Sequence, residues 1–260
     1  MTNIHFIDHS GFLIELEEVF LVFDFFQDPT QVLSRFSKSE KPFVFFVSHS
    51  HQDHWNQEIL NFKTNAPIYY ILDGSCDSEE VRQAATKDQR ELILVKPGDL
   101  LQGQLHGIPS LLRLYVFGST DEGSSFLLVS TAGSFIHMGD LNDWDWQDED
   151  SEKMEADYKA ELTRIAATWS EIHQDETLPS ESKHLQLSFV PVDKRLEETA
   201  LKGALTFLHY LQPEYLLPMH LSGGTELPRE LANTLRQPGH PNTVQVLELT
   251  EPGQIGRAHV

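Results

Sequence analysis

Short apolar runs separated by turn-forming residues dominate the first third of the chain. Runs of this kind, rich in β-branched and aromatic residues, are typical of β-strands. They predict strands at residues 4–7, 12–16, 19–23 and 42–47. The last of these contains the segment FVFFV at residues 43–47, which is apolar throughout and therefore indicates a strand buried on both faces.

Helical and strand-like patterns alternate through the rest of the chain. Apolar residues at helical spacing predict helices over residues 78–89, 152–173 and 197–211, and another directly after residue 54. Strand-like runs lie at residues 68–72, 92–95, 111–117, 125–129, 134–137, 187–192, 215–218 and 244–249. Two strand-rich halves that each end in helices predict an α/β fold, an αββα sandwich of two mixed β-sheets flanked by helices. We expect one domain over residues 1–252 and a disordered C-terminal tail over residues 253–260.

The net charge of the chain and the distribution of its basic residues indicate which kinds of partner it can bind. The chain has 19 Lys and Arg against 40 Asp and Glu, which gives a net charge of −21. Nucleic-acid-binding proteins usually present a clustered basic patch, whereas the only adjacent basic pair here is Lys194-Arg195. We therefore expect a small-molecule substrate, with neither a nucleic acid nor a membrane as partner.

Cysteine use and the first residues favour the cytoplasm. The single cysteine, Cys76, cannot form an intramolecular disulfide, which fits a reducing compartment. The first six residues show no basic segment followed by an apolar one, so no signal peptide is expected. No apolar run approaches the roughly 20 residues that a membrane span requires. These features predict a cytoplasmic protein.

The densest group of candidate metal ligands directly follows the strand at residues 43–47. It reads His49-x-His51-x-Asp53-His54. Residues two apart on an extended chain project to the same side, so His49 and His51 can grip one ion. Asp53 and His54 lie where the chain turns and can point at a second ion. Imidazole and carboxylate ligands suit zinc, iron or manganese better than calcium. A polar loop with exposed histidines is the alternative interpretation.

This motif resembles the signature of metallo-β-lactamase-fold proteins, and further residues follow in that family's order. The resemblance implies that Asp24 supports the metal loop, that Asp140 bridges two metals and that His220 is the last ligand. The segment DHSGF at residues 8–12 resembles the opening of the branch that includes lactonases acting on phosphorylated ascorbate and N-acylphosphatidylethanolamine phospholipases. The implied cofactors are two divalent metal ions, with zinc expected and manganese or iron as alternatives.

The chemistry of the later residues supports the same assignment. A carboxylate has two oxygens, so Asp140 can bridge two cations. The residue before it, Gly139, has no side chain and lets the backbone approach closely at this point. The alternative role for Asp140 is an N-cap for a following helix. His220 follows an apolar strand and could alone be a satisfied buried histidine. The order of the motifs favours metal ligation for both.

One ligand of the family pattern has no counterpart. The family places a third histidine of the first metal in the segment that here spans residues 118–124 and contains none. His106 and His137 fall at unsuitable positions, so Asp121 is the best substitute because a carboxylate coordinates directly. This replacement predicts a weaker or differently selective first site that favours manganese or iron over zinc. The alternative is that the segment is only a turn and that a single metal is bound by Asp53, His54, Asp140 and His220.

These residues predict a metal-dependent hydrolase. A water bound by two cations loses a proton near neutral pH, because coordination lowers its pKa to about 7. We expect the metal-bound hydroxide to be oriented by Asp53 and to cleave a small-molecule ester, lactone or phosphodiester. A metal-dependent nuclease of the same fold and a non-catalytic metal-binding sensor are the competing hypotheses.

Several residues are expected to surround the centre. Asp24 can accept the outer ring N–H of a ligand histidine. His9 is expected to line the pocket, and Asn142 and Trp144, with Trp146 beside them, to cover a substrate from the loop that follows the bridging aspartate. Arg195 is expected to hold a phosphate or carboxylate group, with an exposed turn as the alternative.

Overall fold

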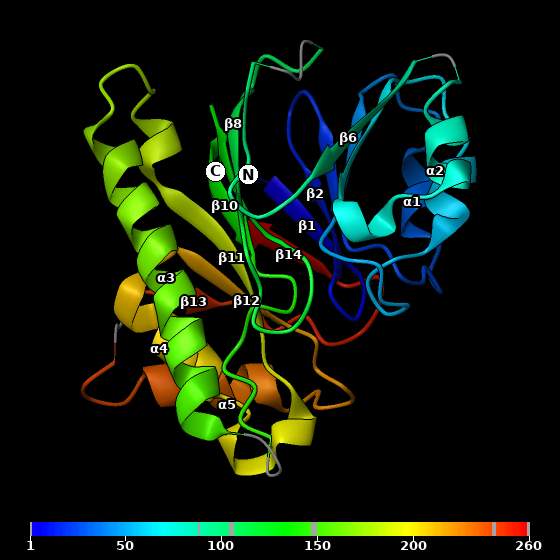
Figure 1. Ribbon diagram of the computed structural model, residues 1–260. Coiled ribbons are helices and arrows are strands. Elements are labelled where there is room, and N and C mark those ends of the chain that lie inside the picture. Colours follow the sequence, from blue (N-terminus) through cyan, green and yellow to red (C-terminus); the bar gives the residue numbers. More distant parts are fainter. Residues whose placement is uncertain (1, 88, 104–106, 147–149, 241–242, 259–260) are drawn as a thin grey trace.

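Two β-sheets pack face to face, with helices on the outer side of each (Figure 1). The computed structural model describes residues 2–87, 89–103, 107–146, 150–240 and 243–258. Both sheets are mixed, and each has seven strands. The predicted αββα sandwich is therefore confirmed. Among the described helices, none is long and apolar enough to cross a membrane.

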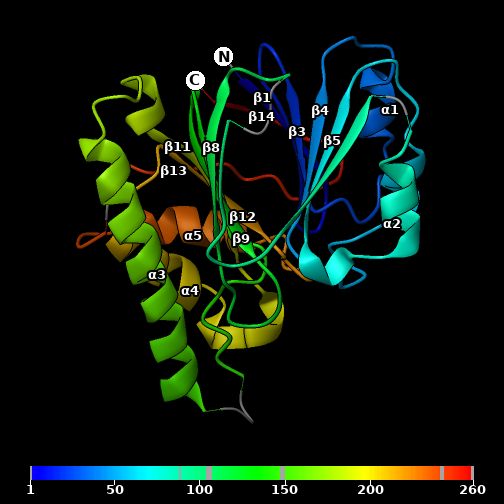
Figure 2. The ribbon, with the colours of Figure 1, turned by 45° about the horizontal axis from the view of Figure 1, so that its top comes forward.

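The first sheet comes mainly from the N-terminal part of the chain. Its strand order is β14-β1-β2-β3-β4-β5-β6, parallel from β3 to β6 and antiparallel elsewhere. Helices α1 (Val32–Phe36) and α2 (Glu79–Ala84) cover its outer face (Figure 2). The strands are β1 (Thr2–Asp8), β2 (Gly11–Glu15), β3 (Phe20–Phe23), β4 (Phe43–Val47), β5 (Ile68–Asp73), β6 (Arg90–Val95) and β14 (Ile255–Ala258).

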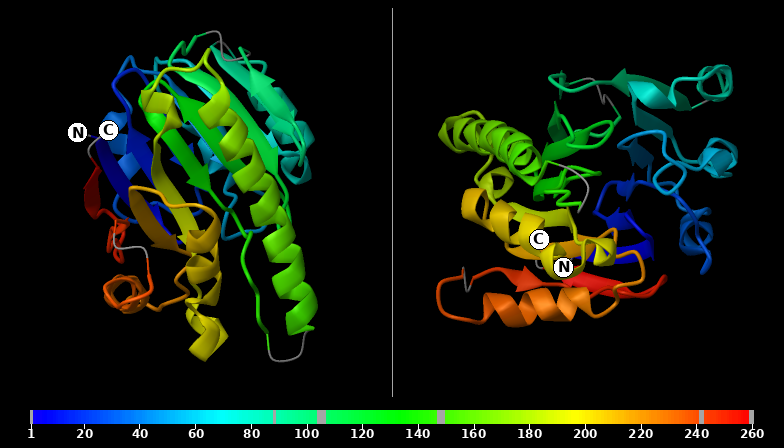
Figure 3. Two further views of the ribbon diagram at one scale, coloured as in Figure 1. Left: turned by 90° about the vertical axis from the view of Figure 1, so that its left-hand side faces the viewer. Right: turned by 60° about the horizontal axis from the view of Figure 1, so that its bottom comes forward.

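The second sheet has the order β13-β12-β11-β10-β9-β8-β7 and is parallel from β10 to β13. The long helix α3 (Ser151–Gln174) runs along its outer face beside α4 (Lys202–Tyr210), and α5 (Leu227–Leu235) packs on β12 and β13 (Figure 3). The strands are β7 (Leu100–Gln102), β8 (Leu111–Phe117), β9 (Ser125–Ser130), β10 (Gly133–His137), β11 (Leu185–Pro191), β12 (Tyr215–Met219) and β13 (Gln245–Val246).

The apolar strand β4 is buried on both faces, as the sequence predicts. Side chains alternate between the faces of a strand, so Phe46 enters the core between the two sheets while Phe43 and Phe45 pack under the outer helices. Phe46 stacks on Phe23 of β3 at a ring separation of 4.6 Å. Because β4 is fixed from both sides, the loop that follows it starts from a rigid base.

Several local predictions need correction. The sequence predicts a disordered tail over residues 253–260, but residues 255–258 form β14, which pairs antiparallel with β1 at the edge of the first sheet; residues 259–260 lie outside the described residues. The helix expected after residue 54 is a short 3₁₀ segment, Gln57–Asn61. The helix expected from residue 197 begins only at Lys202, because Lys194–Thr199 forms 3₁₀ turns with a left-handed residue inside. The sequence prediction also missed α1, α5 and β7.

The strand ends at one edge of the sandwich carry the candidate ligands. Asp24 follows β3, the histidine motif follows β4, Asp140 follows β10 and His220 follows β12. Each of these strands belongs to the parallel part of its sheet, so their carboxyl ends lie at one edge of that sheet. The two edges meet, because His54, after β4, contacts Asp140, after β10. Ligands of open α/β sheets bind at this edge. The fold thus brings together residues that are far apart in the sequence.

Candidate metal centre

The loop after β4 is held by a buried aspartate. Asp24 is fully buried, and its two oxygens accept hydrogen bonds from Ser48 N (2.8 Å) and Ser48 Oγ (2.7 Å). The same carboxylate accepts a hydrogen bond from His54 Nδ1 at 2.8 Å. Because Nδ1 is occupied, His54 presents Nε2 to the centre. Asp24 therefore has the position expected of a carboxylate that orients a ligand histidine.

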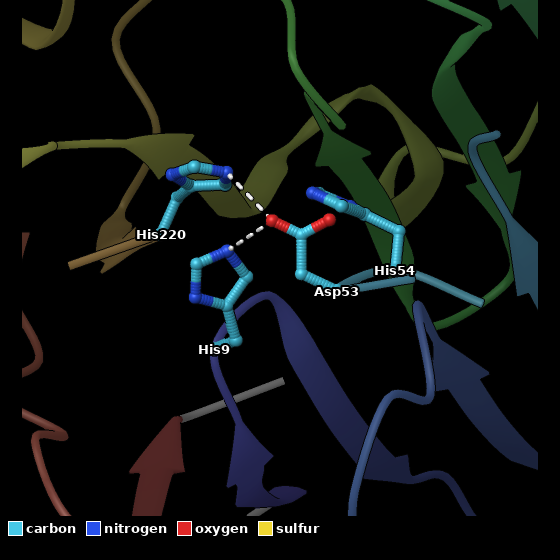
Figure 4. A group of neighbouring side chains, drawn as sticks. All are labelled: His9, Asp53, His54 and His220. Atoms are coloured by element: carbon cyan, nitrogen blue, oxygen red, sulfur yellow. Dashed lines mark ion pairs between the residues drawn. The ribbon is translucent and has the colours of Figure 1, made fainter. Parts of the chain in front are cut away.

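One group of four side chains brings its ligand atoms within 4.8 Å of one another: His9, Asp53, His54 and His220. Figure 4 shows the rings of His9 and His220 directed at the carboxylate of Asp53. The distance from Asp53 Oδ2 is 3.4 Å to His9 Nε2 and 3.8 Å to His220 Nε2. His9 comes from the turn between β1 and β2, and His220 from the end of β12.

A second group has ligand atoms within the same limit: His49, His51 and Asp140. Asp140 lies between the two groups. Its Oδ2 is 3.5 Å from His49 Nε2, and its Oδ1 is 3.0 Å from His54 Nε2 and 3.5 Å from His220 Nε2. One carboxylate oxygen therefore faces each group, which is the arrangement that a bridging ligand requires.

These distances fit ligands of shared cations. Two ligand atoms about 2.0–2.2 Å from one zinc ion lie roughly 2.8–3.6 Å apart, for bond angles of about 90–110°. The separations around Asp140 all fall in this range. Moreover, four buried ligand atoms of the two groups are among the buried polar atoms that make no hydrogen bond to any part of the chain that the structure describes: His9 Nε2, His49 Nε2, His54 Nε2 and Asp140 Oδ1. Buried polar atoms in native proteins are almost always satisfied, and a bound cation would satisfy these.

The electrostatics of the centre favour positive charge. Burial alone would lower the pKa of His54, but the nearby carboxylates of Asp140 and Asp24 outweigh burial and raise that pKa to about 10. Burial opposes ionisation of Asp140, yet His54, His220 and His49 hold its pKa below the usual range. Burial lowers the pKa of His49, which favours the neutral imidazole that binds metals. The raised pKa means that His54 Nε2 tends to carry a proton, and this proton lies where a bound cation would lie.

A second aspartate orients His220. Asp193 follows β11 and is fully buried, and its Oδ2 accepts a hydrogen bond from His220 Nδ1 at 2.9 Å. Arg195 donates to the same carboxylate through Nε (3.0 Å) and Nη2 (2.5 Å). The sequence prediction grouped Asp193 with its basic neighbours and missed this role. Its signal was an acidic residue at the end of an apolar strand, as for Asp24.

The segment at residues 118–124 lies over the first group. Ser124 N donates to Ser48 O at 2.8 Å, which fixes the segment against the histidine loop. Asp121 lines the adjacent pocket but is not among the residues of either ligand group. Burial and the nearby Asp140 raise the pKa of Asp121. Glu122, which the sequence prediction did not name, contacts His51 Nε2 through Oε2 at 3.2 Å.

The centre opens into a pocket of about 210 Å³. Trp144 and Trp146 stack at 5.7 Å with nearly parallel rings on one wall, and the Arg195 guanidinium lies 5.5 Å from the Trp146 ring centre. Asn142, expected on this wall, instead lies buried against Gly203 of α4 and is not among the lining residues. The lining residues are His51, Asp53, Asp121, Asp140, Trp144, Trp146, Met154, Arg195 and His220.

Comparison with known proteins gives matches only at the level of structure. No protein-family model and no curated protein sequence matches the chain. Igni18, a metallo hydrolase from Ignicoccus hospitalis, is 16% identical, with 98% of this chain and 97% of that chain covered and a TM-score of 0.62. For YhfI of Bacillus subtilis, a metallo-β-lactamase fold protein, the identity is 13%, the coverage 98% of both chains and the TM-score 0.60. For the short form of human tRNase Z, these values are 12%, 99% of this chain and 100% of that chain, and 0.54. The chain therefore has the metallo-β-lactamase fold.

Proposed function

We propose that this chain is a metal-dependent hydrolase that cleaves an ester, lactone or phosphodiester bond in a small molecule. One observation carries the proposal: the buried carboxylate of Asp140 points one oxygen at each of two histidine groups. Two divalent ions, with zinc as the expected metal, would be held by His49, His51 and Asp140 on one side and by Asp53, His54, His220 and Asp140 on the other. Asp121 is proposed as a further ligand of the first ion.

Metal ions in this centre would polarise a carbonyl or phosphoryl oxygen and make water acidic enough to act as a nucleophile near neutral pH. The protein supplies the geometry. Asp24 and Asp193 fix the rings of His54 and His220 through their Nδ1 atoms. Asp53 is about half-exposed at the floor of the pocket, so its carboxylate can orient a water molecule toward a substrate.

The pocket favours a small substrate that carries a negative charge. Its volume of about 210 Å³ is below the range of about 300–1,000 Å³ for sites that bind drug-sized ligands. Arg195 is the one lysine or arginine among the described residues that line it. Because Asp193 holds the guanidinium in place, Arg195 presents a fixed cation that can bind a carboxylate or phosphate group.

Replacing Arg195 with alanine tests this recognition. We expect a KM at least about tenfold higher for an anionic substrate, since a charged hydrogen bond contributes roughly 1.5–3 kcal/mol, with little change for a neutral analogue. Metal content must be measured in parallel, because Arg195 also contacts the aspartate that orients His220. An equal effect on anionic and neutral substrates would refute the proposed role.

A substrate screen tests the hydrolase proposal. Protein loaded with zinc, manganese or iron(II) is assayed against nitrophenyl esters, lactones, bis-nitrophenyl phosphate and an oligoribonucleotide. His51→Ala and Asp140→Asn should abolish turnover, whereas His173→Ala, on the exposed side of α3, should not. Cleavage of the oligonucleotide alone would support a nuclease, and metal binding without any turnover would support a sensor. Both outcomes would overturn the proposal.

A further inference from the structure

The turn between β1 and β2 places a third imidazole beside Asp53. His9 Nε2 is 3.4 Å from Asp53 Oδ2, within the range found for two ligands of one ion. The His9 ring lies 4.0 Å from the His220 ring and 5.6 Å from the His54 ring, measured between ring centres. All four side chains surround one point, and their ligand atoms converge on it (Figure 4).

The backbone of this turn is fixed by the rest of the centre. The His9 carbonyl accepts a hydrogen bond from His220 N at 3.2 Å, and the Ser10 carbonyl accepts one from His137 Nε2 at 3.0 Å. A Cβ atom at Gly11 would lie 2.9 Å from the Asp24 carbonyl oxygen, so only glycine allows this approach. The turn is thus hydrogen-bonded to the ends of β12 and β10 and packs closely against the residue that follows β3.

His9 also has an unfavourable backbone conformation. Its φ of 52° lies in the left-handed region, which is strained for a non-glycine residue. His220 shares this feature with a φ of 59°, and Asp24 with a φ of 41°. Strained residues of this kind cluster at functional sites, where surrounding contacts hold them. In His9 the strain directs the ring into the centre, where Nε2 is buried and makes no hydrogen bond within the described ranges.

We propose that His9 is a direct ligand of the second metal site and that this makes the two sites unequal. The inference rests on the proposed function, because both concern the same centre. The second site then has three imidazoles, from His9, His54 and His220, together with Asp53 and Asp140. The first site has His49 and His51, shares Asp140 and lacks the third histidine of the family pattern.

The inequality has two consequences. The second site fills first, because it has more protein ligands and its histidines are buried or nearly so. The two sites also differ in metal preference. Imidazole-rich sites suit zinc, whereas the first site is flanked by the carboxylates of Asp121 and Glu122, which suit manganese or iron(II) better.

Zinc titration of the metal-free protein tests the inequality. Calorimetry with a competing chelator should give two unequal affinities for the wild type. His9→Ala should weaken the tighter one at least about tenfold and leave the other unchanged, and His51→Ala should do the reverse. His173→Ala is the matched control and should change neither. If His9→Ala leaves both affinities unchanged, His9 is not a ligand, although the hydrolase proposal stands. If the wild type binds no zinc, both proposals fail.

A cysteine variant distinguishes a ligand from a residue that only positions Asp53. A thiolate bound to cobalt(II) gives a charge-transfer absorption that an indirect contact cannot produce, and cysteine is itself a ligand of such sites. We expect this band in cobalt-loaded His9→Cys and not in the wild type, whose Cys76 is buried elsewhere under the first sheet. Normal cobalt binding by a folded His9→Cys without the band would overturn the assignment.

Discussion

The loop that carries Asp140 depends on a buried ion pair with α4. Lys202 Nζ lies 3.1 Å from Asp143 Oδ2 and contacts Asp145 and Glu155 at 3.1 and 3.2 Å. The Asp143 side chain is fully buried, whereas that of Lys202 is 29% exposed. Burial raises the pKa of Asp143 against the opposing effect of Lys202. Replacing Lys202 with methionine keeps the side-chain length and leaves the Asp143 carboxylate buried without its partner.

The expected loss of stability follows from this geometry. Breaking one side of a buried pair costs about 3–5 kcal/mol. We take the lower end, about 3 kcal/mol, because Lys202 remains partly exposed to water. For a chain of this size, that corresponds to a fall in Tm of roughly 6–12 °C. Thermal unfolding followed by circular dichroism at pH 7 gives the value, and Lys202→Met combined with Asp143→Asn should recover most of the loss.

The pH dependence provides a second test of the same pair. Without Lys202, the folded-state pKa of Asp143 rises further above its unfolded value of about 3.9, so the folded protein prefers the protonated acid. A raised carboxyl pKa destabilises the fold as the pH rises above the unfolded value. The difference between variant and wild type should therefore shrink as the pH falls from 7 toward 4. A difference that is constant over this range, or a Tm change below about 2 °C, would refute the account of a buried unpaired carboxylate.

Two further changes test other parts of the centre. Asp24→Asn should weaken zinc binding about 10–100-fold, because His54 loses the carboxylate that orients its ring; an affinity within twofold of wild type would contradict this. Gly139→Ala should destabilise the fold by about 2–4 kcal/mol in chemical denaturation, because φ is 53° and a Cβ would lie 2.8 Å from Ser48 Cβ. Gly223→Ala, at a φ of 84° with open space around it, is the control and should cost only the strain of about 1 kcal/mol; equal losses would contradict the argument from close approach.

Local patterns predict much of the fold. The apolar β4 and the helical spacing of α3 follow from periodicity alone, because their burial is continuous. Helix α5 also has a periodic pattern: Leu227, Leu231 and Leu235 recur every fourth residue, and Pro228 lies in the first turn of the helix. Strand β14 has no comparable signal. Its buried residues are Gly256 and Ala258, and only pairing with the distant β1 makes it a strand.

The candidate site was predictable where its chemistry is concentrated in one segment. The histidine motif is recognisable as a metal-binding segment from the sequence, because three histidines and an aspartate directly follow an apolar strand. Other roles depend on contacts between distant segments. Asp193 reaches His220 because β11 and β12 run parallel in a fixed register. Glu122 meets His51 because the segment before β9 is bonded to Ser48. No local pattern contains that information.

Anomalous X-ray diffraction can show whether these segments converge around Asp140 to hold two metal ions. Crystals of the zinc-loaded protein, measured on both sides of the zinc absorption edge, show where zinc ions are bound. We expect two anomalous peaks about 3.5–4 Å apart, one on each side of the Asp140 carboxylate, with His9 beside the peak nearer His220. Zinc bound only elsewhere on the protein, with no peak next to Asp140, would contradict the account.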